Sequence, residues 1–428
     1  MREERDSSPL RGETVRGEQM AEHLTEQIET EIGVKINDSY CGRCTICSSI
    51  CPYEAISSDE KTGEVNIDIE KCQVCGICFS ACPVSAIETI YYNVDSMINY
   101  VKKAMHKTDF TKLVLTCQGT TPLQSETMDK LKKHGVSDFI SLRLPCVGRT
   151  PTEFLLKALA LGINKIVAIP CEEDYCRFEK GSMIGTRRFL LTQALLNQLG
   201  FSSDTLTVIR SLNKAIINVY RCIGCGDCAY ICPYNAIELA APGVAQINPD
   251  KCSGCGLCVA VCPALAIELE GFEHESISQS ISNYSSLIPE KKSKSKTPVI
   301  LVFCCQWSEF PALDKNQSFS NENVMLLELP CSARVDSLHI LEALHSGFDG
   351  VLVVACEKSE CKLEKGNEKA EERISSLKKL LAQVNLENRL EICFTSPRYM
   401  GELDKNIKSF MERISSLPEK PHIGAFEK

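Results

Sequence analysis

Runs of consecutive apolar residues alternate with amphipathic stretches in two separate parts of the chain. In the first part, buried-type strands are predicted at 113–117, 137–146, 164–171 and 205–210, and helices at 151–162 and 181–200. The second part repeats the pattern, with strands predicted at 299–304, 323–331, 349–356 and 389–394 and helices at 335–347 and 365–384. Strands that alternate with helices predict two small parallel-sheet α/β domains.

The remaining chain has shorter apolar segments between closely spaced cysteines and prolines, which indicates two small α+β modules. The expected fold class is therefore α+β and α/β multidomain. The predicted segments are a charged N-terminal tail (1–36), a cysteine-rich module (37–92), a helical connector (93–111), an α/β domain (112–212), a second module (213–272), a flexible serine- and lysine-rich linker (273–297), a second α/β domain (298–415) and a tail (416–428).

The composition narrows the classes of function. The formal net charge of -9 argues against nucleic acid as the main partner. No apolar run approaches the ~18 residues that cross a bilayer, so no membrane span is expected. The chain has 26 cysteines and no secretory signal at its start, which favours metal ligands over disulfides. We therefore expect a cytoplasmic protein in a reducing environment, that of an anaerobe.

Many of the cysteines fall in runs of the form C-x2-C-x2-C-x3-C-P. The first pair of runs comprises Cys41, Cys44, Cys47 and Cys51, then Cys72, Cys75, Cys78 and Cys82. The second pair comprises Cys222, Cys225, Cys228 and Cys232, then Cys252, Cys255, Cys258 and Cys262. Thiolates are soft ligands, and this spacing is typical of iron–sulfur clusters, with zinc as the alternative.

Each α/β domain also has four cysteines at equivalent positions. Cys117, Cys146 and Cys171 each end a predicted strand, and Cys176 follows five residues later. Ligands of open parallel sheets bind beyond the carboxyl ends of the strands, so these thiols are expected to converge. Internal matches such as RLPCVGR with ELPCSAR pair them with Cys305, Cys331, Cys356 and Cys361. Packing alone does not require the same four thiols twice, so both sets are predicted metal ligands.

The double cysteine runs resemble those of bacterial two-cluster ferredoxins over the whole of each module. In that family the fourth cysteine of each run binds the other cluster. The resemblance implies four [4Fe-4S] clusters, held by Cys41, Cys44, Cys47 and Cys82; by Cys72, Cys75, Cys78 and Cys51; by Cys222, Cys225, Cys228 and Cys262; and by Cys252, Cys255, Cys258 and Cys232. It also implies that two ferredoxin-like 2[4Fe-4S] modules alternate with the two α/β domains.

The α/β repeat resembles the delta subunit of methyl-viologen-reducing hydrogenase, through CCQW, PCSAR and ACEKSEC in the second copy. The first copy is more diverged and has Gly119 where the second has Trp307. Because that family has one [2Fe-2S] cluster in such a unit, the resemblance implies two here. Their ligands would be Cys117, Cys146, Cys171 and Cys176, and Cys305, Cys331, Cys356 and Cys361.

Arg149 and Arg334 each lie three residues after a predicted ligand. They are expected either to stabilise a reduced, more anionic cluster as cofactor-binding residues or to form a salt bridge at a helix start. No G-x-G-x-x-G motif opens a helix after a strand and no P-loop is present, so no flavin or nucleotide is expected in this chain. The seven histidines show no metal-ligand spacing.

The resemblances imply an iron–sulfur electron-transfer subunit of an oxidoreductase complex. Its expected role is to relay electrons between a low-potential donor (hydrogenase, formate dehydrogenase or ferredoxin) and a flavin-containing partner of the heterodisulfide-reductase type. Two alternatives stay open. One is a self-contained reductase that acts on a disulfide or similar substrate at one cysteine-lined α/β crevice, and the other is a scaffold or sensor with structural or regulatory clusters.

Overall fold

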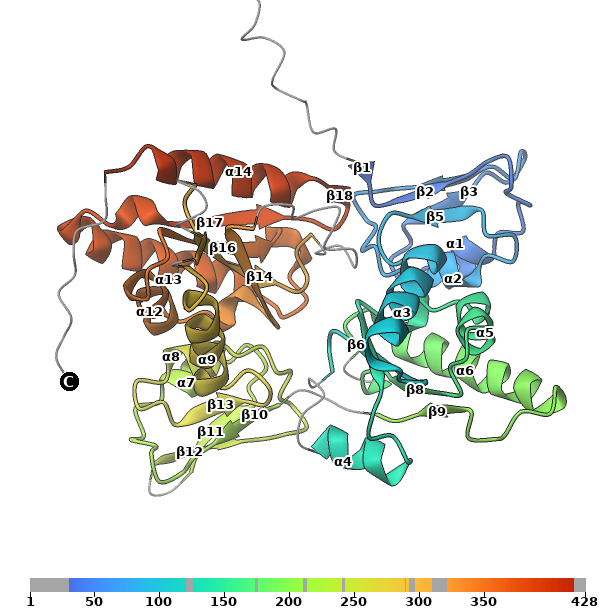
Figure 1. Cartoon of the computed structure of the whole chain (residues 1–428), viewed down its shortest axis with the longest axis horizontal. Coiled ribbons are helices and arrows are strands. Elements are labelled where there is room, and N and C mark those ends of the chain that lie inside the picture. The colour runs from blue at the N-terminus through green and yellow to red at the C-terminus, as the bar shows by residue number, and fades with distance from the viewer. Residues whose placement is uncertain are drawn as a thin grey trace, which may run out of the picture.

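The computed structural model describes residues 31–120, 126–173, 176–210, 214–240, 243–288, 290–291, 297–309 and 322–418. Figure 1 shows four parts, which follow the chain from blue at the upper right through green and yellow to red at the upper left. The first and last parts meet where β1 (Glu31–Ile32) pairs antiparallel with β18 (Tyr399–Met400). The chain therefore closes on itself.

The two cysteine-rich modules share one architecture of two antiparallel strand pairs and two short helices. The first contains β2 (Val34–Ile36), α1 (Ile46–Ile50), β3 (Ile56–Ser58), β4 (Val65–Ile67), α2 (Ile77–Ala81) and β5 (Ile87–Thr89). The second contains β10 (Ala215–Ile217), α7 (Asp227–Ile231), β11 (Ile237–Ala240), β12 (Val244–Ile247), α8 (Leu257–Val261) and β13 (Ile267–Leu269). β2 pairs with β5 and β3 with β4, as β10 pairs with β13 and β11 with β12. The first and last strands thus hold the ends of each module together.

The two α/β parts each contain a four-stranded parallel sheet, as the apolar pattern predicts. The first sheet has the order β7-β6-β8-β9 and the second β15-β14-β16-β17. Their strands are β6 (Lys112–Cys117), β7 (Ile140–Leu144), β8 (Lys165–Ile169), β9 (Leu206–Val208), β14 (Ile300–Cys305), β15 (Val324–Leu329), β16 (Gly350–Cys356) and β17 (Leu390–Thr395). The register pairs Cys117 with Leu144 and Cys305 with Leu329, so neighbouring strands end together at one edge.

Helices cover both faces of these sheets. They are α3 (Val94–Thr108), α4 (Glu126–Lys133), α5 (Thr152–Ala160) and α6 (Gly181–Gln198) in the first half, and α9 (His274–Ser285), α12 (Ser337–His345), α13 (Gly366–Leu381) and α14 (Glu402–Ser415) in the second. Alternate residues of β14 point to opposite faces, because the side-chain period of a strand is two. Leu301 and Phe303 therefore join the core under α12 and α13, whereas Ile300 and Val302 pack against α14.

The prediction of a flexible linker at 273–297 is wrong for the first part of this segment, which forms α9. Ile277 and Ile281 are buried and lie four residues apart, on one helical face. A helix that buries only this narrow stripe can be rich in serine elsewhere, which explains the error. Residues 289 and 292–296 lie outside the described residues.

The prediction of a charged tail at 1–36 is also wrong for the last residues of this segment, which form β1 and β2 and include the buried Val34. Their partners, β18 and β5, are distant in sequence, so no local pattern marks them. Residues 1–30 lie outside the described residues, as do 419–428 of the expected C-terminal tail.

Candidate metal centres

Each of the four crossed cysteine sets expected in the modules lines a cavity of its own. We name them the outer quartet of the first module (Cys41, Cys44, Cys47, Cys82), the inner quartet of the first module (Cys51, Cys72, Cys75, Cys78), the outer quartet of the second module (Cys222, Cys225, Cys228, Cys262) and the inner quartet of the second module (Cys232, Cys252, Cys255, Cys258). Each outer quartet contains one exposed cysteine, Cys44 or Cys225, and the inner quartets contain none.

The environment of these sulfurs suits thiolate ligands of a metal. Backbone N–H groups point at them: Ala86 N donates to Cys82 Sγ at 3.2 Å and Ala266 N donates to Cys262 Sγ at 3.2 Å. Such bonds stabilise the negative charge of cluster thiolates. Burial raises the pKa of Cys78 to about 12, so this thiol stays protonated at neutral pH without a metal. All 26 cysteines are free, and none forms a disulfide.

The strand-end cysteines also converge in both α/β parts. We name them the first strand-end quartet (Cys117, Cys146, Cys171, Cys176) and the second strand-end quartet (Cys305, Cys331, Cys356, Cys361). In the second, hydrogen bonds from the Cys331 and Cys356 thiols lower the pKa of both Cys305 and Cys361. In the first, the Cys171 thiol donates to Cys117 and the Cys117 thiol donates to Cys146. Each quartet therefore presents several sulfurs to one point.

Glycines at matching positions leave room for these sulfurs. Gly181 begins α6 and Gly366 begins α13. A Cβ on Gly181 would lie 2.6 Å from Cys146 Sγ, and one on Gly366 would meet Cys331 Sγ. The space beside each quartet is thus too small for a side chain at this position. Four convergent thiols in a space kept free by glycine fit the predicted ligation by a metal cluster.

Arg149 and Arg334 both lie at the junction between a module and the following α/β part, and both are fully buried. Arg149 Nη2 donates to Tyr91 O at 2.6 Å, and Arg334 Nε donates to Phe272 O at 3.0 Å. Each arginine packs on the glycine of an inner-quartet run. A Cβ on Gly76 would lie 2.7 Å from Arg149 Cβ, and one on Gly256 would lie 2.9 Å from Arg334 Cδ.

The salt bridge that was one alternative for these arginines occurs at Arg334, whose Nη1 lies 3.6 Å from Asp336 Oδ2. Within the described part of the chain, Arg149 has no such carboxylate. Burial lowers the pKa of Arg149, and Tyr92 and Cys75 lie close enough to oppose this shift when they are ionised. The position of both arginines beside an inner quartet therefore favours a role toward that quartet.

The two strand-end quartets meet at the centre of the molecule. One apolar group of residues includes Cys75 of the inner quartet of the first module, Cys146, and Cys305. The rings of Phe178 and Trp307 pack edge to face in the same group, with centroids 5.7 Å apart. Cysteines of three quartets thus share one buried core.

Backbone and side-chain amides also join the two strand-end quartets. Gln118 and Gln306 each follow the first cysteine of a strand-end quartet, and Gln306 Nε2 donates to Gln118 O at 2.8 Å. Arg143 Nη2 donates to the same carbonyl at 2.9 Å and to Gln306 Oε1 at 3.1 Å. These bonds hold the two α/β parts together at their strand ends.

The side chains of two basic residues, neither of which was predicted from the sequence, form hydrogen bonds between the two halves of the chain. Arg177 and Lys362 occupy equivalent positions, each directly after the last cysteine of a strand-end quartet. Arg177 Nη2 donates to Ser253 O in the second module, and Lys362 Nζ donates to Gln73 Oε1 in the first. Each contact lies next to an inner-quartet cysteine. The signal was a basic residue at the same place in both copies, in CRFEKG and CKLEKG.

Comparison with protein families identifies the α/β repeat. Residues 113–215 and 300–418 match the methyl-viologen-reducing hydrogenase, delta subunit, and these two ranges cover more than half of the chain. The chain belongs to that family. Residues 40–86 and 215–269 each match a 4Fe-4S dicluster domain. The two resemblances stated from the motifs are therefore confirmed.

Relatives of two kinds each match part of the chain. Over 201 residues, the chain is 33% identical to a ferredoxin:CoB-CoM heterodisulfide reductase subunit of Methanosarcina mazei, covering 46% of this chain and 24% of that protein. Over 128 residues, it is 31% identical to an F420-non-reducing hydrogenase vhu iron-sulfur subunit of Methanocaldococcus jannaschii, covering 29% of this chain and 96% of that protein. The chain thus spans about a quarter of the length of the first relative. Among the described helices, none combines the length and apolar character needed to cross a membrane.

Proposed function

We propose that this chain is an iron–sulfur electron-transfer subunit. It relays electrons between a low-potential donor (a hydrogenase, a formate dehydrogenase or ferredoxin) and a flavin-containing partner of the heterodisulfide-reductase type. Its proposed parts are two ferredoxin-like modules (34–92 and 213–272) that alternate with two α/β domains (112–212 and 298–415). The observation that carries the proposal is that six four-cysteine sets adjoin one another through the molecule.

The proposed cofactors are four [4Fe-4S] clusters on the module quartets and two [2Fe-2S] clusters on the strand-end quartets. Bound clusters of these kinds supply one-electron acceptors. Contacts between cysteines of neighbouring quartets give the order of the proposed clusters along the molecule. The inner quartet of the first module adjoins the first strand-end quartet through Cys75 and Cys146, and the second strand-end quartet adjoins the inner quartet of the second module through Cys331 and Cys255. The outer quartets, with exposed Cys44 and Cys225, form the two ends.

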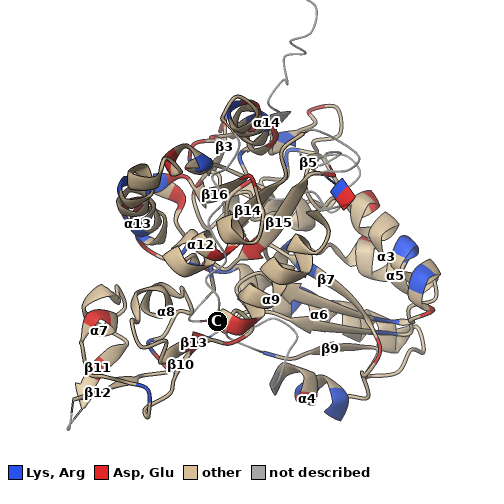
Figure 2. Cartoon of the chain, turned by 60° about the vertical axis from the view of Figure 1, so that its left-hand side comes forward, with Lys and Arg blue, Asp and Glu red and all other residues tan. Residues whose placement is uncertain are grey.

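The surface around the outer quartet of the second module supports docking of a protein partner. Tyr220, Ile223 and Tyr230 expose 98%, 68% and 93% of their area there. Figure 2 shows most of this module, around α7, β11 and β12, in tan, whereas α13 carries many blue and red residues. Exposed aromatic and aliphatic side chains in a region of low charge are typical of protein interfaces.

The reductase alternative requires an accessible thiolate at a strand-end crevice. Cys117, Cys146 and Cys171 expose only 1%, 1% and 3% of their area. Burial raises the pKa of Cys117, so its thiol is neither accessible nor readily ionised. At the first strand-end quartet, where only Cys176 is partly exposed, these properties favour buried ligands over a substrate-reducing cysteine.

Iron content tests the cofactors. Anaerobically reconstituted protein is expected to hold about 20 iron atoms, roughly 16 in the modules and four at the strand ends. Cys305→Ser removes a proposed ligand and is expected to lower the count by about two. Cys304→Ser is the matched control, because Cys304 is the adjacent buried cysteine and belongs to no quartet. A count of about 16 in the wild-type protein would refute the [2Fe-2S] assignment.

Electron transfer through the co-purified complex tests the function. Reduced viologen is added anaerobically, and reduction of the partner flavin is followed by absorbance in a stopped-flow instrument. Cys305→Ser is expected to slow flavin reduction at least tenfold, while Cys304→Ser leaves the rate unchanged. Equal rates for all three proteins would refute the relay through the second strand-end quartet. A complex in which no flavin protein is present would refute the proposed partner.

A further inference from the structure

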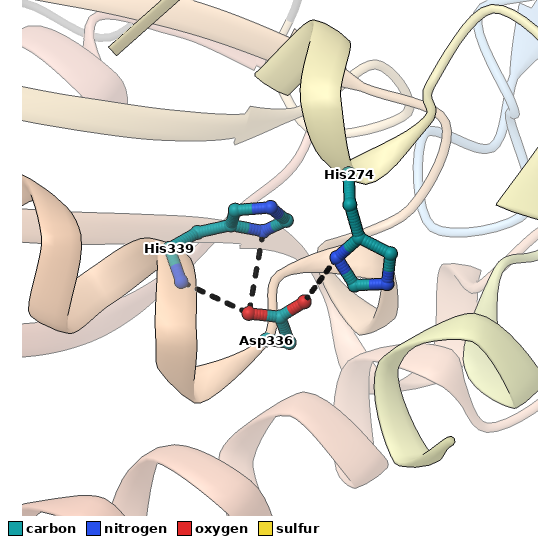
Figure 3. Close-up of side chains that lie close together, drawn as sticks. All are labelled: His274, Asp336 and His339. Atoms are coloured by element: carbon teal, nitrogen blue, oxygen red, sulfur yellow. Dashed lines mark hydrogen bonds and ion pairs between the residues drawn. The ribbon is translucent and has the colours of Figure 1, made fainter. Parts of the chain in front are cut away.

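Two histidines and an aspartate, with no cysteine among them, meet at the junction of the second module and the second α/β part. His274 is the first residue of α9, Asp336 caps the N-terminus of α12, and His339 lies in the first turn of α12. No metal-ligand spacing marks these histidines in the sequence, because they come from two helices that are far apart along the chain. One potential ligand atom from each residue lies within 4.8 Å of the others. Figure 3 shows the carboxylate of Asp336 between the two imidazole rings.

The contacts within this group are close and mostly buried. His274 Nδ1 lies 3.1 Å from Asp336 Oδ2, and His339 Nδ1 lies 3.4 Å from Asp336 Oδ1. The side chains of His339, Asp336 and His274 expose only 2%, 7% and 13% of their area. Within the described part of the chain, both ring nitrogens of His339 and Nε2 of His274 are buried without a well-aligned hydrogen bond. Buried polar atoms without partners cost free energy, so such atoms call for a ligand.

The first half of the chain provides an internal comparison. The repeat that pairs Arg149 with Arg334 places Pro151 opposite Asp336 and Phe154 opposite His339. Pro151 caps α5 as Asp336 caps α12, and Phe154 is fully buried. The first residue of α3, the counterpart of α9, is Val94. The same helix junction is therefore built from apolar residues in the first half, so packing does not explain the polar group in the second.

We propose that His274, Asp336 and His339 form a binding site for one divalent first-row transition-metal ion of the zinc class, which joins α9 to α12. Two imidazoles and one carboxylate are ligands that such ions accept, and three protein ligands leave a fourth position for water. The site takes no cysteine and is distinct from the proposed clusters. The proposal therefore does not depend on the electron-transfer function.

Arg334 gives the site a further consequence. Its Nη1 lies 3.6 Å from the same Asp336 Oδ2 that faces His274. The aliphatic part of the same side chain packs on Gly256, which lies between two cysteines of the inner quartet of the second module. An ion on Asp336 would share this carboxylate with Arg334. The proposed ion thus stabilises the junction at the point where the α/β part contacts the inner quartet.

Zinc binding by the intact, cluster-loaded protein tests the proposal. Anaerobic protein with its full iron content is incubated with Zn²⁺ in the presence of a weak competing chelator, desalted, and analysed for zinc and iron. The wild type is expected to retain one zinc per chain. His274→Val/His339→Phe introduces the residues that the first half has at these positions, and is expected to retain almost none with unchanged iron. His345→Ala alters an exposed histidine on the same helix and is expected to keep the zinc.

Unfolding provides the second measurement. Bound zinc is expected to raise the Tm of the wild type and of His345→Ala, because an ion that binds only the folded state stabilises it. The Tm of His274→Val/His339→Phe should not respond to zinc. Equal zinc retention by the wild type and the double variant would overturn the proposal and leave the group as a hydrogen-bonded contact only. A wild type that binds no zinc while its iron is complete would also overturn it.

Discussion

Arg149 shows at the level of one residue how packing and charge act together. Its side chain is fully buried, and its Nε and Nη1 have no hydrogen-bond partner within the described part of the chain. A buried cation without a compensating charge is costly. The inner quartet of the first module lies beside it, through Gly76 and the cysteines on either side of that glycine. An anionic cluster held by that quartet would provide the missing charge.

The corresponding prediction concerns reduction potential. Arg149→Met is expected to make the cluster of the inner quartet of the first module harder to reduce, because the extra electron loses a positive neighbour. A unit charge about 10 Å away at an effective dielectric constant of about 20 is worth roughly 1.7 kcal/mol, or about 70 mV for a one-electron couple. Anaerobic redox titration followed by EPR measures the shift.

Two control variants separate charge from packing in this experiment. Arg149→Lys keeps the charge and is expected to keep most of the potential. Arg187→Met removes an exposed charge from α6 and is expected to have little effect, since water screens it. A potential that is the same in Arg149→Met and Arg149→Lys would contradict an electrostatic role for this arginine.

The predicted ligand cysteines can be recognised from the sequence, whereas the basic residues that contact neighbouring modules cannot. The spacing within each run is local, the resemblance to two-cluster ferredoxins implies how the runs cross, and the internal repeat pairs the strand-end cysteines. The members of all six quartets could therefore be proposed from the sequence. Arg177 and Lys362 act across the two halves, on Ser253 and Gln73. Such contacts depend on how the parts dock, and spacing within one segment says nothing about docking.

Among the structural elements, the short helices of the modules explain where glycine is required. Each helix begins after a residue with positive φ, and at Thr45 that residue is not glycine. Gly76 and Gly256 hold the same position in the runs that face Arg149 and Arg334. The arginine side chain occupies the space that a Cβ would need. The close approach of the arginine, rather than the backbone conformation alone, therefore requires glycine at these two positions.

Gly256→Ala and Gly226→Ala separate these two effects. Gly226 has a φ of +86°, close to the +80° of Gly256, but a Cβ there meets only Leu239 Cδ1 at 3.5 Å. Gly226→Ala is expected to lower the free energy of unfolding by about 1–2 kcal/mol, the cost of a left-handed residue. In Gly256→Ala the new methyl group also overpacks against Arg334, which is expected to lower the free energy of unfolding by a further ~1–3 kcal/mol. Anaerobic urea unfolding followed by circular dichroism gives both values, and equal losses would contradict the explanation.

The prediction of secondary-structure elements was correct where many positions of an element are apolar, and it failed where few are. The β-strands of the two sheets are almost continuously apolar, as in Ile300–Cys305, and their positions and parallel arrangement followed from the sequence. The helix α9 buries little more than Ile277 and Ile281, and its serines suggested a linker. Periodicity with so few apolar positions is too weak to separate a surface helix from a polar connection.

At the scale of the whole molecule, the last part of the chain closes onto the first. Arg398 Nε donates to Cys72 O at 2.9 Å across 326 residues, and Tyr399 Oη donates to Glu70 Oε1 at 2.7 Å. Arg398 Nη1 also pairs with Glu360 Oε1 at 2.9 Å, where the side chains expose only 8% and 4% of their area. The first module is thus bound by the α/β part that follows it and by the one at the far end of the chain.

Arg398→Met tests whether this closure stabilises the molecule. It leaves the Glu360 carboxylate buried without its cation and removes a donor from Cys72 O. Breaking a buried pair from one side typically costs about 3–5 kcal/mol, so the variant is expected to unfold at clearly lower urea than the wild type. The first module is also expected to release its iron faster, because one of its contacts with the last α/β part, the bond to Cys72 O, is lost.

The double variant Glu360→Gln/Arg398→Met determines which part of the loss belongs to the unpaired charge. Glutamine keeps the hydrogen bond from Ser396 Oγ but carries no charge, so much of the lost stability should return. Iron release should stay fast, since the donor to Cys72 O is still missing. Lys408→Met, which removes a half-exposed pair with Asp404, should cost less than about 1 kcal/mol. If the double variant restored both stability and slow iron release, the contact with Cys72 O would contribute nothing to closure. The first module would then be held to the far end of the chain by its other contacts, such as the β1–β18 pairing and the bond from Tyr399 to Glu70.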